Sequence, residues 1–298
     1  MKRINLGKSD LQISEVAFGC MSLGSNFRQN QQILHQALDG GINFFDTADL
    51  YQQGENETCL GRVFKDRRQE VVIATKVGNQ LRADGSGWDW NPRKDYILSA
   101  VEDSLRRLQT DYIDLYQLHG GTIDDPTDET IEAFEMLKAA GKIRWYGISS
   151  IRPNVIRRFV ERSQMVSVMM QYSLLDRRPE ESCFPLLQDA GVGVIVRGAL
   201  ARGLLAGKTP TSYLNLDRDR VENAAYAVKR LSQPDRNPAQ TALQFALGHP
   251  AVTTVAAGIR TAAQLRDALG AAECPGLTEE ERQKLSGIAP AQVYEQHR

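Results

Sequence analysis

The sequence lacks several features that would assign it to a class by themselves. A membrane-spanning helix needs about 18 uninterrupted apolar residues, and no stretch of the 298 residues approaches that length. The N-terminus, MKRINLGKSDLQ, has no apolar core of a signal peptide. A formal net charge of -1 provides no field that would draw the chain to nucleic acid or to an anionic membrane. We therefore expect a cytoplasmic protein that binds neither of them.

Cysteine is also scarce. The chain has four cysteines, Cys20, Cys59, Cys183 and Cys274, which lie far apart and form no CxxC pair. This spacing indicates reduced thiols and neither a disulfide framework nor a metal site. A chain of this length can bury a sizeable core without such links. No Gly/Pro-rich linker divides it, so residues 1–298 are predicted to form a single domain, for which a monomer is permitted and an oligomer not excluded.

What the chain does contain is a regular alternation of two patterns. Short apolar runs recur as EVAFGC, INFFD, VVIATK, YIDLYQLH, RWYGISS, VSVMMQ, VGVIVR and VTTVAAG. Segments of helical period separate these runs, and Gly40, Gly141 and Gly191 stand where left-handed C-caps would end three of the helices.

Continuous apolar strands that alternate with helices predict a parallel sheet buried on both faces. Eight such units predict an α/β fold, a closed (β/α)8 TIM-type barrel, and residues 3–14 predict a short N-terminal β-hairpin before it. An open doubly wound sheet is the alternative. Two connections, 78–94 and 203–236, are longer than plain loops and are expected to carry function.

The apolar runs end in polar residues. These are Asp46, Lys76, His119, Ser149 with Ser150, Gln171 and Arg197. Because the carboxyl ends of barrel strands surround one mouth, these side chains would converge on a single site.

Each of these residues has an ordinary structural explanation when taken alone. Asp46 could cap a helix, Lys76 could be a solvated edge residue, and Tyr51 an interfacial aromatic. Together they suggest acid–base chemistry: a nearby Lys76 would lower the pKa of the Tyr51 phenol, and Asp46 would hold Lys76. His119 could donate to an oxygen that gains charge, so the group lacks only a hydride, which side chains cannot supply.

Several segments resemble, in order, the motifs of the aldo-keto reductases. They are INFFDTADLYQQGENE, VVIATKVGN, DYIDLYQLHGG, IRWYGISS, ALARGLLAGK and VAAGIRTAAQLRDAL, and the bacterial YqkF-like group is the most similar. The resemblance implies a TIM-type barrel that binds NADPH and reduces aldehydes and ketones. It also implies a catalytic tetrad of Asp46, Tyr51, Lys76 and His119, in which Tyr51 protonates the carbonyl oxygen.

The same resemblance implies the cofactor contacts. They are Met21, Asp46, Ser149, Ser150, Gln171, Arg197, Gly198, Leu200, Arg202, Gly203, Leu204, Lys208, Gly258, Arg260, Gln264 and Asp267. Ser149 and Ser150 would contact the nicotinamide carboxamide, and the 198–208 loop would cover the pyrophosphate. Arg260 would bind the 2′-phosphate, which favours NADP(H) over NAD(H).

Some positions depart from the family pattern. Met169 stands where a glutamine usually contacts the carboxamide, so either Gln171 takes over or the carboxamide loses a partner. Arg197 stands where an aromatic ring usually stacks on the nicotinamide. We expect this cation to disfavour the positively charged NADP+.

The adenosine end departs as well. Ala268 replaces the usual adenine-contacting Asn, so Asp267 is the substitute. Thr261 and Gln264 also form a T-x-x-Q capping box, which needs no ligand to explain it.

The substrate pocket is predicted from Trp88, Trp90 and the last residues of the chain, with the alternative that the WDW segment only anchors a long loop. Two other functions stay open. One is an NADPH-binding redox sensor or regulatory subunit with little turnover. The other is an unrelated barrel enzyme that uses Lys76 as a Schiff base.

Overall fold

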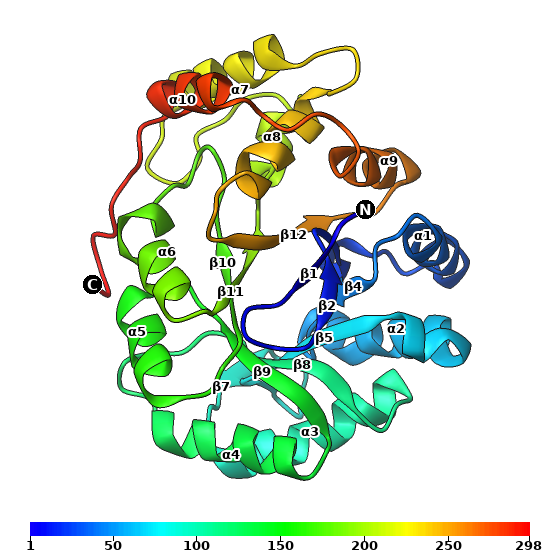
Figure 1. Cartoon of the computed structure of the whole chain (residues 1–298). Coiled ribbons are helices and arrows are strands. Elements are labelled where there is room, and N and C mark those ends of the chain that lie inside the picture. Colours follow the sequence, from blue (N-terminus) through cyan, green and yellow to red (C-terminus); the bar gives the residue numbers. More distant parts are fainter.

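Eight parallel strands form a closed barrel in the computed structural model, which describes residues 1–298 (Figure 1). In chain order they are β3 (Val16–Gly19), β4 (Phe44–Asp46), β5 (Val72–Val77), β8 (Ile113–Leu118), β9 (Ile143–Ser149), β10 (Ser167–Gln171), β11 (Gly193–Arg197) and β12 (Val252–Gly258). They coincide with the eight apolar runs. Pairing of β12 with β3 and of β9 with β10 closes the cylinder, so the predicted barrel is confirmed and the open sheet is excluded.

Ten helices surround the barrel. They are α1 (Phe27–Asp39), α2 (Glu55–Phe64), α3 (Lys94–Leu108), α4 (Thr127–Ala139), α5 (Pro153–Arg162), α6 (Pro179–Asp189), α7 (Arg218–Leu231), α8 (Pro238–Leu247), α9 (Ala262–Ala271) and α10 (Glu279–Ile288). None of them combines the length and the apolar character that crossing a membrane requires.

The barrel strands are buried on both sides, which explains why their sequences do not alternate. Every residue of β5 and of β8 is buried. One core of 69 buried residues lies between the barrel and the helices, and a second core of 12 fills the barrel interior. Interior positions such as Phe44, Ala74 and Leu115 belong to the second core.

The predicted N-terminal hairpin is present and closes the amino-terminal end of the barrel. Its strands are β1 (Arg3–Asn5) and β2 (Gln12–Ser14), drawn in dark blue across the barrel in Figure 1. Leu6, Leu11 and Ile13 join the interior core. A Cβ on Gly7, which has a φ of +55°, would lie 2.4 Å from the Val166 carbonyl oxygen, so the turn fits only as glycine. Because this end is plugged, a ligand can enter only at the opposite mouth.

Both long connections contain secondary structure. The first folds into an antiparallel hairpin of β6 (Asn79–Leu81) and β7 (Trp88–Trp90). The second contains the last four residues of the 3-10 segment η4 (Ala201–Ala206) and all of α7.

One predicted C-cap is displaced by a residue. Gly141 and Gly191 have positive φ angles, but Gly40 has a φ of -77° and Gly41 adopts the left-handed conformation instead, at +97°. The helix therefore ends as predicted, with its reversal one position later.

Candidate active site

A buried ion pair lies inside the barrel, at the carboxyl ends of two neighbouring strands. Lys76 on β5 is fully buried, and its Nζ donates to Asp46 Oδ2 at 2.8 Å and to the Thr47 carbonyl oxygen at 2.6 Å. Asp46 ends β4, and Gln117 on β8 donates to its other oxygen at 3.4 Å. The barrel interior tolerates two charges here because each has partners within hydrogen-bonding distance.

The two charges stabilise each other. Burial lowers the pKa of Lys76, but Asp46 and Tyr51 outweigh it, so the net pKa is raised and Lys76 stays an ammonium. Burial raises the pKa of Asp46, and Lys76 opposes this shift. The short contact and the fixed ammonium favour the ionised pair.

Tyr51 follows β4 in the 3-10 segment η2 (Tyr51–Gly54), and its phenol oxygen lies 3.4 Å from Lys76 Nζ. The chain reverses sharply after it: Gln52, Gln53 and Gly54 all have positive φ, at 51°, 55° and 91°. A hydrogen bond from Gln52 Nε2 to the Leu23 carbonyl oxygen, 2.7 Å long, holds this strained turn.

The pKa of Tyr51 differs from the expectation. Burial raises it from 10.0, and although Lys76 lowers it as predicted, burial has the larger effect. The predicted effect of Lys76 is thus present, but burial, which the prediction did not include, outweighs it and the net pKa is raised. Tyr51 consequently stays protonated through the neutral range and can act as an acid.

His119 directly follows β8 and meets the Tyr51 ring edge-on, with ring centroids 5.9 Å apart. Burial, with Lys76 and Arg197, lowers its pKa to about 3. The imidazole is therefore neutral, and its Nδ1 is buried without a partner. A neutral ring with a buried Nδ1 can present an Nε2–H to a ligand oxygen.

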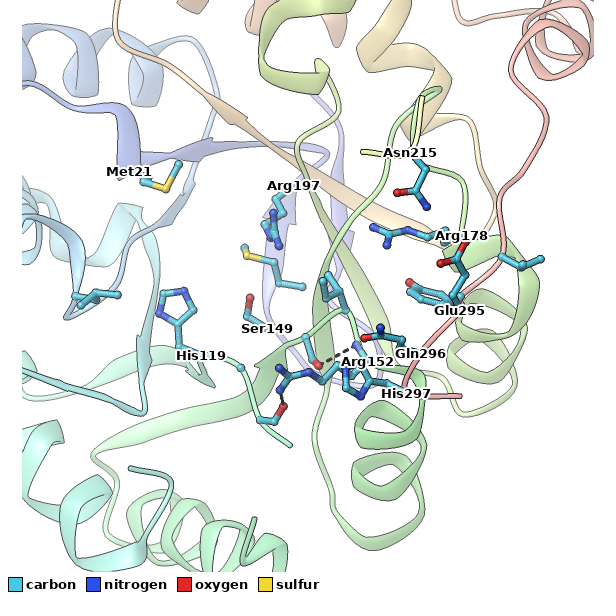
Figure 2. Close-up of a pocket in the computed structure, with 18 of the residues that line it drawn as sticks. Met21, His119, Ser149, Arg152, Arg178, Arg197, Asn215, Glu295, Gln296 and His297 are labelled. Carbon is cyan, nitrogen blue, oxygen red and sulfur yellow. Dashed lines mark hydrogen bonds between the residues drawn. The ribbon is translucent and has the colours of Figure 1, made fainter. Parts of the chain in front are cut away.

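A cavity of about 690 Å³ opens over this group at the barrel mouth (Figure 2). Its wall includes six of the predicted site residues, namely Met21, Tyr51, His119, Ser149, Ser150 and Arg197. Asp46 and Lys76 lie beneath the cavity. Lys76 contacts both Asp46 and the hydroxyl of Tyr51, which lines the cavity wall. The structure thus places the four predicted catalytic side chains in one continuous arrangement.

Arg197 is positioned by a hydrogen-bonded chain. Its Nη1 donates to Gln171 Oε1 at 3.0 Å, and Gln171 Nε2 donates to the buried Asp176 at 2.8 Å and to the Tyr213 hydroxyl at 3.2 Å. Met169, which replaces the family glutamine, lines the cavity. The Gln171 amide is therefore occupied in holding Arg197.

The remaining predicted cofactor residues lie outside this cavity, near the ends of β11 and β12. Gly198, Leu200, Arg202, Gly203, Leu204 and Lys208 belong to or flank η4, while Gly258 ends β12 and Arg260, Gln264 and Asp267 lie just before or on α9. The predicted capping box is present, and Gln264 Oε1 accepts from the backbone N–H groups of Arg260 and Thr261. Asp267 Oδ1 accepts from Asn237 Nδ2 at 2.8 Å.

The two tryptophans do not line the cavity. Trp88 on β7 is 48% exposed. Trp90 donates from Nε1 to the Asp125 carboxylate at 3.0 Å and packs against Gly78, where an added Cβ would come within 2.6 Å of the ring. These contacts are those of a loop anchor, and a direct substrate contact stays a prediction.

Residues 293–297, at the end of the chain, form part of the cavity wall. Three polar residues that the strand pattern did not single out also line it, namely Arg152, Arg178 and Asn215. Arg152 stands only two positions after Ser150, which is the one sequence signal that could have found it.

A closed parallel barrel that places a buried Lys–Asp pair beneath a cavity-facing tyrosine and a neutral histidine provides a site suited to acid–base chemistry on a ligand oxygen. The family model for the aldo/keto reductase family matches residues 15–290. The chain therefore belongs to the aldo/keto reductase family, as the resemblance predicted.

Individual relatives agree with this assignment. The chain is 48% identical to the uncharacterized oxidoreductase YqkF of Bacillus subtilis (strain 168) over the full length of both. It is 34% identical to the aldo-keto reductase yakc [NADP(+)] of Schizosaccharomyces pombe, over 67% of this chain and 63% of that one. The holo form of the aldo-keto reductase AKR11C1 from Bacillus halodurans superimposes with a TM-score of 0.94 at 54% identity, covering 100% of this chain and 99% of that one.

Asp49, two residues before Tyr51, is a buried carboxyl without adequate partners. Its Oδ1 makes no hydrogen bond, and burial, with the nearby Glu57, raises its pKa to about 8. The unfolded chain releases this proton near about pH 4. The folded chain holds it to about pH 8. The free energy of unfolding therefore falls as the pH rises from about 4 to about 8, because only the folded chain keeps the Asp49 proton over this range.

We predict that Asp49→Asn stabilises the fold, because the amide keeps the shape and has no proton to lose. The gain in free energy of unfolding should be small at acid pH and reach the order of 2 kcal/mol near pH 8. Urea unfolding at several pH values measures it. Asp103→Asn, at a partly exposed position, is the control, and a gain for Asp49→Asn that did not grow with pH would contradict the assignment.

Proposed function

We propose that this aldo-keto reductase reduces aldehydes and ketones to alcohols with NADPH and that Tyr51 is its proton donor. The observation that carries the proposal is the Tyr51 hydroxyl, which lies 3.4 Å from the buried Lys76 ammonium and faces the cavity beside a neutral His119. A carbonyl oxygen in this corner has a proton donor and a hydrogen-bond donor on adjacent sides.

Each residue then has one task. Tyr51 donates its proton to the carbonyl oxygen, and the Lys76 ammonium stabilises the phenolate that remains. Asp46 keeps Lys76 charged and in place through the 2.8 Å contact. His119 donates a hydrogen bond to the same oxygen as charge develops there. When bound, a nicotinamide cofactor supplies the hydride, which no side chain can provide.

The residues around the mouth suit such a cofactor. Ser149 and Ser150 present hydroxyls at the cavity wall for a carboxamide. Arg202, Lys208 and Arg260 are exposed cations that form no ion pair within the chain, so they are available for phosphates. We assign Arg260 to the 2′-phosphate, and the NADP(+) in the name of the fission yeast relative supports this choice.

The burial of Lys76 argues against a Schiff-base enzyme. A nucleophilic amine must lose its proton, whereas Asp46 and Tyr51 raise the pKa of Lys76 above 10.5. The amine of this lysine is also not part of the cavity wall.

We predict that Tyr51→Phe lowers kcat for NADPH oxidation by about 10²- to 10⁴-fold, because the ring remains but the proton is lost. In the wild type the reaction needs the protonated phenol, whose pKa burial raises. The rate of reduction should therefore be flat from about pH 6 to about pH 9 and fall only in more alkaline solution. Initial rates with a panel of aldehydes measure both.

Cofactor binding separates the possible outcomes. NADPH fluorescence should show binding to the wild type and to the Tyr51→Phe variant alike. Tight NADPH binding without oxidation by any carbonyl would support the sensor or regulatory alternative, and the absence of binding would reject the proposal.

We further predict that Arg197→Tyr narrows the difference in affinity between NADPH and NADP+. The guanidinium that Gln171 holds at the cavity wall disfavours a cationic nicotinamide, whereas a tyrosine ring does not. Titration of both cofactors against both proteins gives the two Kd ratios. Equal ratios in wild type and variant would show that Arg197 makes no distinction.

A further inference from the structure

The wall of the cavity is basic. It carries three arginines, Arg152, Arg178 and Arg197, against a single carboxylate, Glu295 (Figure 2). Cations that the chain does not neutralise are available to a negatively charged ligand at this opening.

Two of these arginines are already accounted for. Arg178 is neutralised by the buried Asp176, to which it donates twice, from Nε at 2.7 Å and from Nη2 at 2.8 Å. Arg197 is held by the neutral amide of Gln171 and faces the proposed nicotinamide position.

Arg152 has no such partner. Its side chain is half-buried, its Nη1 donates to the Gly121 carbonyl oxygen, and it forms no ion pair with any carboxylate of the chain. His297, from the chain end, lies beside it on the same wall (Figure 2). The backbone carbonyl of His297 accepts from the Asn154 N–H at 2.8 Å, which fixes this residue at the start of α5. An unpaired guanidinium in a partly desolvated wall is a strong site for a carboxylate or a phosphate.

The phosphates of the cofactor do not explain Arg152. The residues that we assign to them, Arg202, Lys208 and Arg260, lie outside this cavity, whereas Arg152 lies within it beside Ser150. Arg152 is therefore left for the substrate.

We propose that the natural substrate is a carbonyl compound that carries an anionic group, a carboxylate or a phosphate, bound by Arg152. This rests on the proposed reductase function and names its substrate class. The guanidinium donates to the carbonyl oxygen of Gly121, which is two residues from His119, so the Cα atoms of Gly121 and His119 lie at most about 7 Å apart. Arg152 and His119 line the same cavity, and the substrates to test are therefore small molecules that carry both the carbonyl and the anionic group.

The test compares matched substrates in matched variants. The carboxylate arm uses 5-oxopentanoate and its methyl ester, and the phosphate arm uses glyceraldehyde 3-phosphate and glyceraldehyde. Each is reduced with NADPH by the wild type, by Arg152→Gln and by Arg162→Gln. Arg162 is the control because it is on the helix that follows Arg152 but is exposed, pairs with Asp128 and does not line the cavity.

We expect the wild type to prefer the charged member of at least one pair. Arg152→Gln should lower kcat/KM for that member by about 10- to 100-fold and leave the neutral member within about twofold. Arg162→Gln should change neither. The arm that responds identifies the anionic group. A wild-type preference for both neutral members, or an equal loss for charged and neutral substrates in Arg152→Gln, overturns the proposal.

Binding without turnover separates this proposal from the proposed function. If no aldehyde is reduced at all, the reductase function fails first, and glutarate and glycerol 3-phosphate then test Arg152 directly, one for each arm. At least one of the two should raise the Tm of the NADPH-saturated wild type and of Arg162→Gln, but not that of Arg152→Gln. The absence of any shift in the wild type with either compound, or an equal shift in all three proteins, rejects the anion site.

Discussion

The ion pair between Lys76 and Asp46 is the constraint on which the site depends. It places two charges in the interior of a closed barrel, where an unpaired charge would be strongly destabilising. Only strand ends at the open mouth can hold such a pair, because the N-terminal hairpin plugs the opposite end with Leu6 and Leu11. The pair therefore fixes which end of the barrel is functional, and it keeps a permanent ammonium beneath the cavity.

That ammonium, together with burial, shifts the pKa values of Tyr51 and His119. It is the main influence that opposes the burial-driven rise in the pKa of Tyr51, and together with burial it keeps His119 neutral. The result is a phenol that keeps its proton near neutral pH and an imidazole that can donate a hydrogen bond without carrying charge. A barrel that reduces carbonyls needs both, since the oxygen gains negative charge as the hydride reaches carbon.

Sequence reasoning predicted the features that recur and missed those that depend on three-dimensional enclosure. The eight strands were readable because burial on both faces makes them continuously apolar. Asp46, Lys76 and His119 were noticed because they stand at or next to the ends of neighbouring strands, whereas the tetrad with Tyr51 was implied by the resemblance to the family motifs. Helix α10 buries only Leu285 and shows no apolar stripe. Helix α7 does bury a stripe of Val221, Ala224, Ala227 and Val228, but this stripe lies in a highly charged segment and was overlooked. The net direction of the Tyr51 pKa required knowledge of its enclosure. Arg152 was not predicted, because an arginine near the start of a helix is common. Only the structure shows that its side chain lines the cavity and forms no ion pair.

The most direct test of the central claim is single-turnover hydride transfer in Lys76→Met, a variant that keeps the volume of the side chain but removes its charge. NADPH bound in advance would be mixed rapidly with a reducible aldehyde, and the loss of its absorbance followed in the wild type and in a variant shown to fold and to bind NADPH normally. The account predicts a rate lower by about 100-fold or more, because the phenolate left on Tyr51 would have no cation beside it. A rate within about threefold of the wild type would show that the buried pair supports the fold alone and contradict the mechanism.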